Sequence, residues 1–215
     1  MNSAHNMLRV AAIVRRSRVL GPGERFVVWV QGCPFACPAC IAPDFLPSVG
    51  GKLVPIDSVL AAIRKEAGID GVTLSGGEPM AQPMAVAELL NGIKTLGLSV
   101  VLFTGYRLEQ LKSRSVDDAS IARVLTSTDV LIDGLYEHGL NDSRGLRGSS
   151  NQRIHFLTDR YRSAIEDFYG KRRLEVDRDD WGEMLVGVPS LNVWRRVVLD
   201  QEPIDKIISV SDDKK

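Results

Sequence analysis

The sequence predicts an α/β protein in which the short strands of a parallel sheet alternate with helices. Three observations support this fold class. The apolar runs are short, continuous and rich in β-branched residues, as in strands buried on both faces. Segments with helical periodicity lie between successive runs, and such connections give right-handed crossovers. Each run ends at polar residues or glycine, and ligands bind at the carboxyl ends of such strands.

The first two strands are expected at residues 8–14 and 26–30, with a turn at residues 21–23 between them. A loop with several prolines and glycines follows. Pro55 then fits the first turn of a helix whose apolar side chains share one face and which ends at Gly68. The covering helices are expected on both faces of the sheet.

The remaining core strands are separated by expected helices, of which one has Pro83 in its first turn. These strands are expected at residues 72–74, 99–103 and 130–132, and the helices at residues 83–97, 108–111 and 118–125. The strand ends and the cysteine segment therefore fall on one rim of the sheet. That convergence favours a ligand site at this rim more strongly than any single motif does.

The C-terminal part is less regular. A glycine-rich loop spans residues 135–151, and loops of this length are usually functional or disordered. A helix is expected at residues 159–169, followed by a charged stretch and an apolar run at 184–189. The tail from Asp200 is mostly polar.

Composition narrows the possible partners and location. With 215 residues and 44% apolar content, the chain can bury a substantial core. The 27 basic and 27 acidic residues cancel, so we expect neither nucleic acid nor a membrane as a partner. No apolar run approaches the roughly 20 residues of a transmembrane helix. The N-terminus lacks the apolar stretch of a secretory signal, and we expect a cytoplasmic protein.

The three cysteines of the chain lie within eight residues, at Cys33, Cys37 and Cys40. Three thiolates can hold three corners of a four-iron cluster and leave the last iron without a protein ligand. A substrate or cofactor can occupy that open position. The cysteine pattern therefore indicates an enzyme with a [4Fe-4S] cluster.

Two other interpretations of the cysteines compete with this one. A structural zinc site normally has four protein ligands, and none of the histidines His5, His138 and His155 is convincingly spaced for the loop. A redox-active pair would leave the third cysteine unexplained. The open-iron cluster is the preferred interpretation.

Residues 75–79, with the sequence SGGEP, form a second candidate motif. Gly76 and Gly77 would let the backbone come close to a ligand. The carboxylate of Glu78 could bind a ligand ammonium through a charge-assisted hydrogen bond. Alone, the motif could equally be a turn with a solvated glutamate. Beside the cysteine loop on the same rim, the functional interpretation is favoured.

Residues 21–33 (GPGERFVVWVQGC), with Cys37, Cys40 and Pro43, resemble the signature of radical S-adenosylmethionine (radical SAM) enzymes that activate glycyl-radical enzymes. Further stretches narrow the resemblance to the anaerobic ribonucleoside-triphosphate reductase activating proteins. These stretches are residues 75–79, 104–106, 129–134 and 147–153. The resemblance covers about residues 8–154.

The resemblance implies a partial parallel (βα) barrel of the radical SAM type. Its core would be residues 8–154, followed by a short C-terminal extension of unknown role at residues 155–215. The three cysteines would ligate the [4Fe-4S] cluster, whose open iron would be chelated by S-adenosylmethionine. The other implied contacts are Gly76, Gly77 and Glu78 to the methionine amino group, and the backbone of Ala39, Cys40 and Ile41 near the nucleoside.

The resemblance also implies the reaction and its partners. An electron from the reduced cluster would cleave the sulfonium bond, yielding methionine and a 5′-deoxyadenosyl radical. That radical would abstract hydrogen from a glycine on the large anaerobic ribonucleotide reductase subunit or another glycyl-radical protein. A low-potential donor such as flavodoxin or ferredoxin would supply the electron.

The chain departs from the family pattern in two places. The family commonly has Asn-Pro shortly after the last cysteine, whereas here Ala42 precedes Pro43. About sixty residues follow Ile154, more than in compact members. A radical SAM enzyme with a different protein or small-molecule target therefore remains an alternative. A non-catalytic iron–sulfur or zinc-binding adaptor is the second.

Other residues have two interpretations each. Asp133, at a strand end, could orient a ribose hydroxyl or cap the following turn, and neither interpretation is preferred. Trp29 and Tyr106 are expected to pack rather than to relay a radical. Three arginines could form a solvated basic face or contact the partner's loop: Arg144, Arg147 and Arg153.

Overall fold

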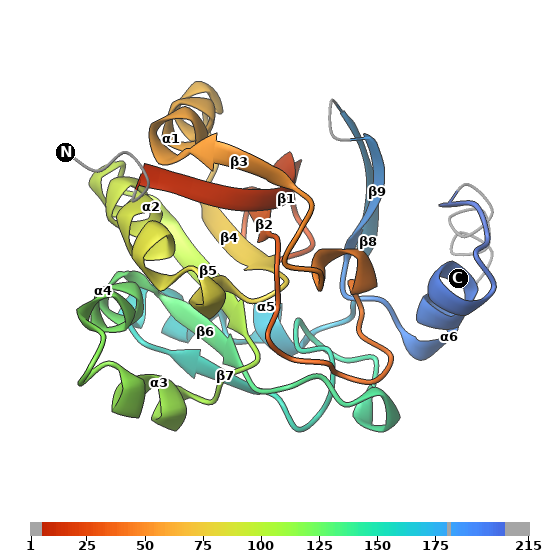
Figure 1. The fold of residues 1–215 in the computed structure, drawn as a ribbon. Helices are drawn as coiled ribbons and strands as arrows, with labels where there is room; N and C mark the ends of the chain where they lie inside the picture. Colours follow the sequence, from red (N-terminus) through yellow and green to blue (C-terminus); the bar gives the residue numbers. More distant parts are fainter. Residues whose placement is uncertain (1–5, 180–181, 205–215) are drawn as a thin grey trace.

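The computed structural model describes residues 6–179 and 182–204. Within them, seven strands form one sheet in the order β3-β1-β2-β4-β5-β6-β7 (Figure 1). The four central strands are parallel. They are β2 (Arg25–Val30), β4 (Gly71–Gly76), β5 (Ser99–Thr104) and β6 (Val130–Asp133). The chain is thus a mixed α/β protein, and each of these strands contains the run predicted from the sequence.

The outer strands of the sheet are antiparallel to their neighbours. They are β1 (Met7–Ser17), β3 (Lys52–Pro55) and β7 (Arg153–Phe156). Seven residues connect β1 to β2, and so short a link cannot make the crossover that parallel strands require. The parallel arrangement expected from the sequence therefore applies to the central strands. No sequence signal predicted β3 or β7.

Four helices cover one face of the sheet (Figure 1). They are α1 (Ile56–Lys65), α2 (Pro83–Thr95), α3 (Leu108–Arg114) and α4 (Ala119–Ser127). The apolar stripes of α1 and α2 are buried against the strands, as their periodicity predicted. The largest apolar cluster lies between these helices and the sheet.

A β-hairpin covers part of the opposite face of the sheet, where helices were expected. The hairpin of β8 (Leu174–Asp179) and β9 (Gly182–Gly187) lies there (Figure 1). Val186 and Val188 pack with side chains of β1 and β2, including Val27 and Trp29. The expectation of helices on this face is met only in part: short helical segments pack against β5 and β6 through Tyr161 and Phe168, and the hairpin covers the strands β1 and β2.

The predicted helix at residues 159–169 is interrupted. A 3-10 helix, Asp159–Ala164, precedes the short α5 (Glu166–Tyr169). The tighter turns place Tyr161 against the sheet, where its hydroxyl lies 2.7 Å from Ser99 Oγ. Farther on, α6 (Leu191–Trp194) continues into a π-helical turn, Arg195–Leu199. The polar tail predicted from Asp200 lies largely outside the described residues.

A buried arginine closes the amino ends of the parallel strands. The side chain of Arg25 is fully buried. Its Nε donates to Thr73 Oγ1 at 2.7 Å and its Nη2 to the carbonyl of Val72 at 2.7 Å. Its Nη1 donates to Ser99 Oγ and to the Tyr161 hydroxyl. Burial lowers the pKa of Arg25, and the hydrogen bonds replace the lost hydration.

Three further 3-10 turns lie near the carboxyl ends of the strands. They are Pro43–Phe45, Pro79–Ala81 and His138–Leu140. No helix in the described part of the chain is both long and apolar enough to cross a bilayer.

Candidate functional site

The carboxyl ends of the four parallel strands surround one cavity. The segments that follow these strands contribute Cys33, Gly77, Gly105 and Gly134 to its wall. All three cysteines line the same cavity. The convergence predicted from the sequence is therefore present in the fold. It follows from parallel strands, whose carboxyl ends meet at one edge of the sheet.

The cysteine loop leaves β2 and is held at both ends by backbone hydrogen bonds. The amide of Gly32 donates to the carbonyl of Phe45 at 2.9 Å, and that of Cys33 to Leu46 at 3.0 Å. Ala39 adopts a left-handed conformation with φ 58°, which is uncommon for a residue with a side chain. It allows a tight turn immediately before Cys40.

The three cysteines are half-buried free thiols. Burial raises the pKa of Cys33 to about 11 and raises the pKa of Cys40. Without a bound metal these two thiols are therefore protonated at neutral pH. Since a metal binds the thiolate, ligation at this loop must release protons.

The number and type of the donors indicate which metal group the loop could hold. Three cysteine sulfurs lie on one loop and line one cavity. A structural zinc site takes four protein ligands. In a [4Fe-4S] cluster each cysteine ligates a different iron, and three cysteines leave one iron open. The three-cysteine donor set therefore fits such a cluster.

Gly76 and Gly77 bring the end of β4 against the start of the cysteine loop. A Cβ on Gly77 would lie 2.3 Å from the carbonyl oxygen of Gly32, and Gly76 has φ 118°. The amide of Gly77 donates to Val30 and that of Glu78 to Gly32. Only glycine allows this approach of two backbones. The motif is therefore more than a surface turn.

Glu78 is 1% exposed, so the solvated-surface interpretation is wrong. Its Oε1 accepts from the amide of Met80 and the hydroxyl of Thr104, both at 2.8 Å. Its Oε2 accepts from the amide of Gly105 at 2.7 Å. Burial raises the pKa of Glu78 to about 7, although these hydrogen bonds favour the carboxylate. The carboxyl group thus ties the end of β4 to the end of β5.

Some of the other residues predicted for the site line the cavity and one does not. Cys40, Ile41 and Ala42 line the cavity. Ala39 is not among the lining residues. Trp29 lines the cavity and packs in an apolar cluster, as expected of a packing residue.

Tyr106 also has a packing role. Its ring meets Phe35 of the cysteine loop edge-on, with 4.7 Å between centroids. The guanidinium of Arg114 lies 4.3 Å from the centre of the Tyr106 ring. This stack supports the cysteine loop from the side of β5.

Asp133 is fully buried and acts as a cap in this structure. Its Oδ2 accepts from the amide of Leu108 at 2.6 Å, at the start of α3. Arg153 donates to both oxygens. Asp133 is absent from the residues that line the cavity, whereas its neighbour Gly134 is present. These contacts favour the capping interpretation over contact with a ribose.

Sequence reasoning missed several residues of the cavity wall. Phe35, Tyr136, Gln152 and Val188 all line it. Gln152 bridges two loops, because its Nε2 donates to the carbonyl of Gly134 and its Oε1 accepts from the amide of Gly148. Gln152 lies within the stretch whose resemblance was noted, and that stretch could have identified it. Val188 belongs to the apolar run noted at residues 184–189, but nothing in the local sequence places that run beside the site.

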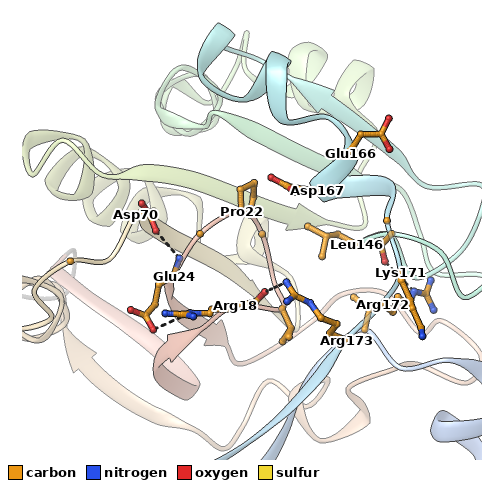
Figure 2. A pocket seen from close by; sticks show the side chains of 17 residues that line it. Arg18, Pro22, Glu24, Asp70, Leu146, Glu166, Asp167, Lys171, Arg172 and Arg173 are labelled. Atoms are coloured by element: carbon orange, nitrogen blue, oxygen red, sulfur yellow. Dashed lines mark hydrogen bonds and ion pairs between the residues drawn. The ribbon is translucent and has the colours of Figure 1, made fainter. Parts of the chain in front are cut away.

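A second cavity, of about 660 Å³, lies near the amino ends of β2 and β4 (Figure 2). Charged side chains of both signs surround it, and some pair with each other, as Arg18 does with Glu24 at 3.5 Å. Leu146 and Val188 line both cavities and separate them. Among the described residues, none of those predicted for the site lines this second cavity.

With this geometry in place, the comparisons with known proteins define a class. Residues 19–155 match the family model described as "4Fe-4S single cluster domain". The chain therefore belongs to this family of single-cluster iron–sulfur proteins. The match ends within β7, so most of the C-terminal segment lies beyond it.

Individual relatives of this chain have more specific names than the family model. An anaerobic ribonucleoside-triphosphate reductase-activating protein of Enterobacteria phage T4 is 33% identical over 148 residues, covering 66% of this chain and 89% of the relative. One from Vibrio cholerae is 35% identical over 150 residues, covering 65% and 92%. A pyruvate formate-lyase-activating enzyme of Clostridium pasteurianum is 34% identical over 106 residues, covering 46% and 44%.

Proposed function

We propose that this chain is a radical SAM activating enzyme that generates a glycyl radical on an anaerobic ribonucleoside-triphosphate reductase. The observation that carries the proposal is that three free cysteines and the Gly76-Gly77-Glu78 segment line one cavity. The names of the relatives with 89–92% coverage support the choice of target. The mixed α/β sheet supports a partial (βα) barrel with its site at the carboxyl rim.

The residues present fit the cluster and its ligand. Cys33, Cys37 and Cys40 would hold three irons of a [4Fe-4S] cluster. A cluster held there would supply the one electron needed to cleave S-adenosylmethionine with release of methionine, which is the chemistry required for hydrogen abstraction from the target glycine. The protein supplies binding, orientation and exclusion of water.

The glycine segment would bind the methionine part of the ligand. Gly76 and Gly77 carry no side chain that could keep a ligand from the backbone here. Glu78 Oε2 accepts one hydrogen bond from Gly105, which leaves a lone pair for a ligand ammonium. The same carboxylate accepts hydrogen bonds from Thr104 and Gly105. It therefore orients the neighbouring wall of the cavity as well as offering an acceptor to the ligand.

The opposite wall would receive the nucleoside. Cys40 and Ile41 line the cavity, and the left-handed turn at Ala39 orients the backbone just before them. Gly148 lies against this wall, because a Cβ there would come 3.0 Å from Ile41 Cδ1 and 2.9 Å from the Tyr136 ring.

The division into a core at residues 8–154 and an extension at 155–215 is part of this proposal. So are a cytoplasmic location and a low-potential donor such as flavodoxin or ferredoxin. Free thiols that must remain reduced support the cytoplasm.

The test is to mix anaerobically reconstituted protein with the large reductase subunit, S-adenosylmethionine and a reductant. The proposal predicts a glycyl-radical signal by electron paramagnetic resonance (EPR) that requires all components. 5′-Deoxyadenosine formation without any radical on the reductase would contradict the target.

A different glycyl-radical protein is the second candidate target. The 34% identity to a pyruvate formate-lyase-activating enzyme supports it, although over less than half of each chain. The same assay with pyruvate formate-lyase in place of the reductase distinguishes the two targets.

A further inference from the structure

The C-terminal segment returns to the cysteine loop and contacts it directly. Trp194, at the end of α6, is 4% exposed. Its indole Nε1 donates to the carbonyl oxygen of Cys40 at 3.2 Å. An indole has a single donor and no acceptor, so this contact uses the whole polar capacity of the ring.

The indole ring of Trp194 is itself held in place by the loop after β6. It lies against the ring of His138, with 4.4 Å between centroids. His138 Nδ1 is 3.3 Å from the hydroxyl of Tyr136, which lines the cysteine cavity. Asn141 Nδ2 donates to the same hydroxyl at 3.2 Å and to the carbonyl of Pro189 at 3.3 Å. One side of the cavity is therefore linked to α6.

Arg172 fixes the same segment from the other side. Its side chain is 7% exposed, and burial lowers its pKa. It donates to Asn141 Oδ1 at 2.7 Å and to the carbonyl of Pro189 at 2.9 Å. It also donates to the carbonyls of Gly145 and Gly148. The chain just before α6 is thereby anchored to the loop, which restricts where Trp194 can lie.

We propose that Trp194 is a positioning residue for the site and that the C-terminal segment completes its wall. By fixing the Cys40 carbonyl, Trp194 fixes the backbone that carries the third cysteine and leads into Ile41 and Ala42. Val188 of the same segment lines the cavity. The segment is therefore part of the site rather than a separable docking module. This inference rests on the proposed function.

The test compares Trp194→Phe, which keeps an aromatic ring but removes the donor, with Trp194→Ala. The matched control is Leu191→Ala, an exposed position on the same helix. Hydrogen–deuterium exchange of the cysteine segment is measured first, on metal-free protein. The rate of cluster loss to an iron chelator and the EPR spectrum of the reduced cluster with S-adenosylmethionine follow, on reconstituted protein.

For Trp194→Phe we expect the exchange of residues 33–46 and the rate of cluster loss to rise roughly fivefold, as for the loss of one hydrogen bond. The EPR spectrum with S-adenosylmethionine should broaden or shift, while the thermal midpoint stays near that of the control. Trp194→Ala should show larger changes in the same direction, because it also loses the contact with His138.

The outcomes separate this inference from the proposed function. Wild-type exchange, cluster loss and EPR spectrum in both Trp194 variants would overturn the positioning role. A fall in thermal midpoint with no change localised to residues 33–46 would also overturn it, since the role would then be only structural. If the wild-type protein binds no cluster, the proposed function fails, and the exchange measurement on metal-free protein still tests the contact.

Discussion

The two ends of the parallel strands are built in opposite ways. At the amino ends, the guanidinium of Arg25 is fully buried and donates to hydroxyls and carbonyls of at least four residues. At the carboxyl ends, glycines keep the backbone open around a cavity with three free thiols. The comparison indicates that polar groups at one end stabilise the sheet, while the other end is left accessible for chemistry.

Glu78 is an exception to this difference between the two ends of the strands. It is a buried charged group at the carboxyl end, with its hydrogen bonds directed to the neighbouring strand. Its raised pKa shows the cost of burying a carboxylate without a cation in contact. Glu78 therefore links two strands at the functional end, and its protonation state depends on its surroundings. Arg25, at the other end, has no such role in the site.

The largest expected effect is that of removing a cysteine. Cys37→Ala should abolish the reductive cleavage of S-adenosylmethionine and lower the bound iron well below the roughly four atoms of an intact cluster. Stability should change little, because Cys37 is half-buried in a loop. Iron analysis and product chromatography measure this, with the exposed Val49→Ala as control. Full iron content in the variant would disprove the ligand assignment.

Arg25→Met should act on the opposite end. It removes all guanidinium donors of the buried network, so the acceptors on Thr73, Val72 and Ser99 lose these hydrogen bonds. We expect the free energy of unfolding to fall by about 3 kcal/mol or more. Urea denaturation measures this, with the half-exposed Arg15→Met as the matched control. A variant of normal stability that no longer binds iron would refute the separation of roles between the two ends.

Gly77→Ala tests the close approach at the carboxyl end. The added Cβ would meet the Gly32 carbonyl at 2.3 Å, so one backbone must shift. We expect a loss of about 2 kcal/mol in unfolding free energy together with weaker retention of iron. The control is Gly139→Ala, where an added Cβ has no neighbour within 4 Å. Equal stability and iron retention in the two variants would argue against a tight packing role.

The smallest expected effect concerns pH. The pKa of Glu78 is raised from 4.5 to about 7, chiefly by burial, so the folded state binds this proton more tightly than the unfolded chain. The stability that this group contributes is full below pH 4.5 and is lost as the pH rises through about 7. Wild type should therefore lose about 1–2 kcal/mol relative to Glu78→Gln between about pH 5.5 and about pH 8.

Urea denaturation of both proteins at the two pH values measures this difference. A wild type that gains stability relative to Glu78→Gln as the pH rises would reverse the predicted sign. That result would mean that the three donors to the carboxylate outweigh its burial.

Much of the core could be predicted from the sequence because its signals are local. The apolar face of α1 follows the helical period, β5 is a continuous apolar run rich in valine, and both elements lie where predicted. The shared rim followed from the parallel order of the strands. The cysteine spacing predicted a donor set without any knowledge of the fold, and the structure brings all three cysteines to one cavity.

The rest depended on contacts between distant residues. β3 is an exposed edge strand of four residues without a buried face. β8 has the polar sequence LEVDRD, and its place is fixed by pairing with β9. The contact of Trp194 joins residues 154 positions apart, and nothing near the tryptophan signals it. Tertiary packing, rather than local propensity, decides such features.

The central claim is that three cysteines hold a cluster with one iron left open for S-adenosylmethionine. The most direct measurement is EPR of the anaerobically reconstituted, reduced protein with and without that compound. The account predicts a [4Fe-4S] signal that shifts when S-adenosylmethionine is added. Identical spectra, or a protein that takes up stoichiometric zinc and no iron, would contradict it.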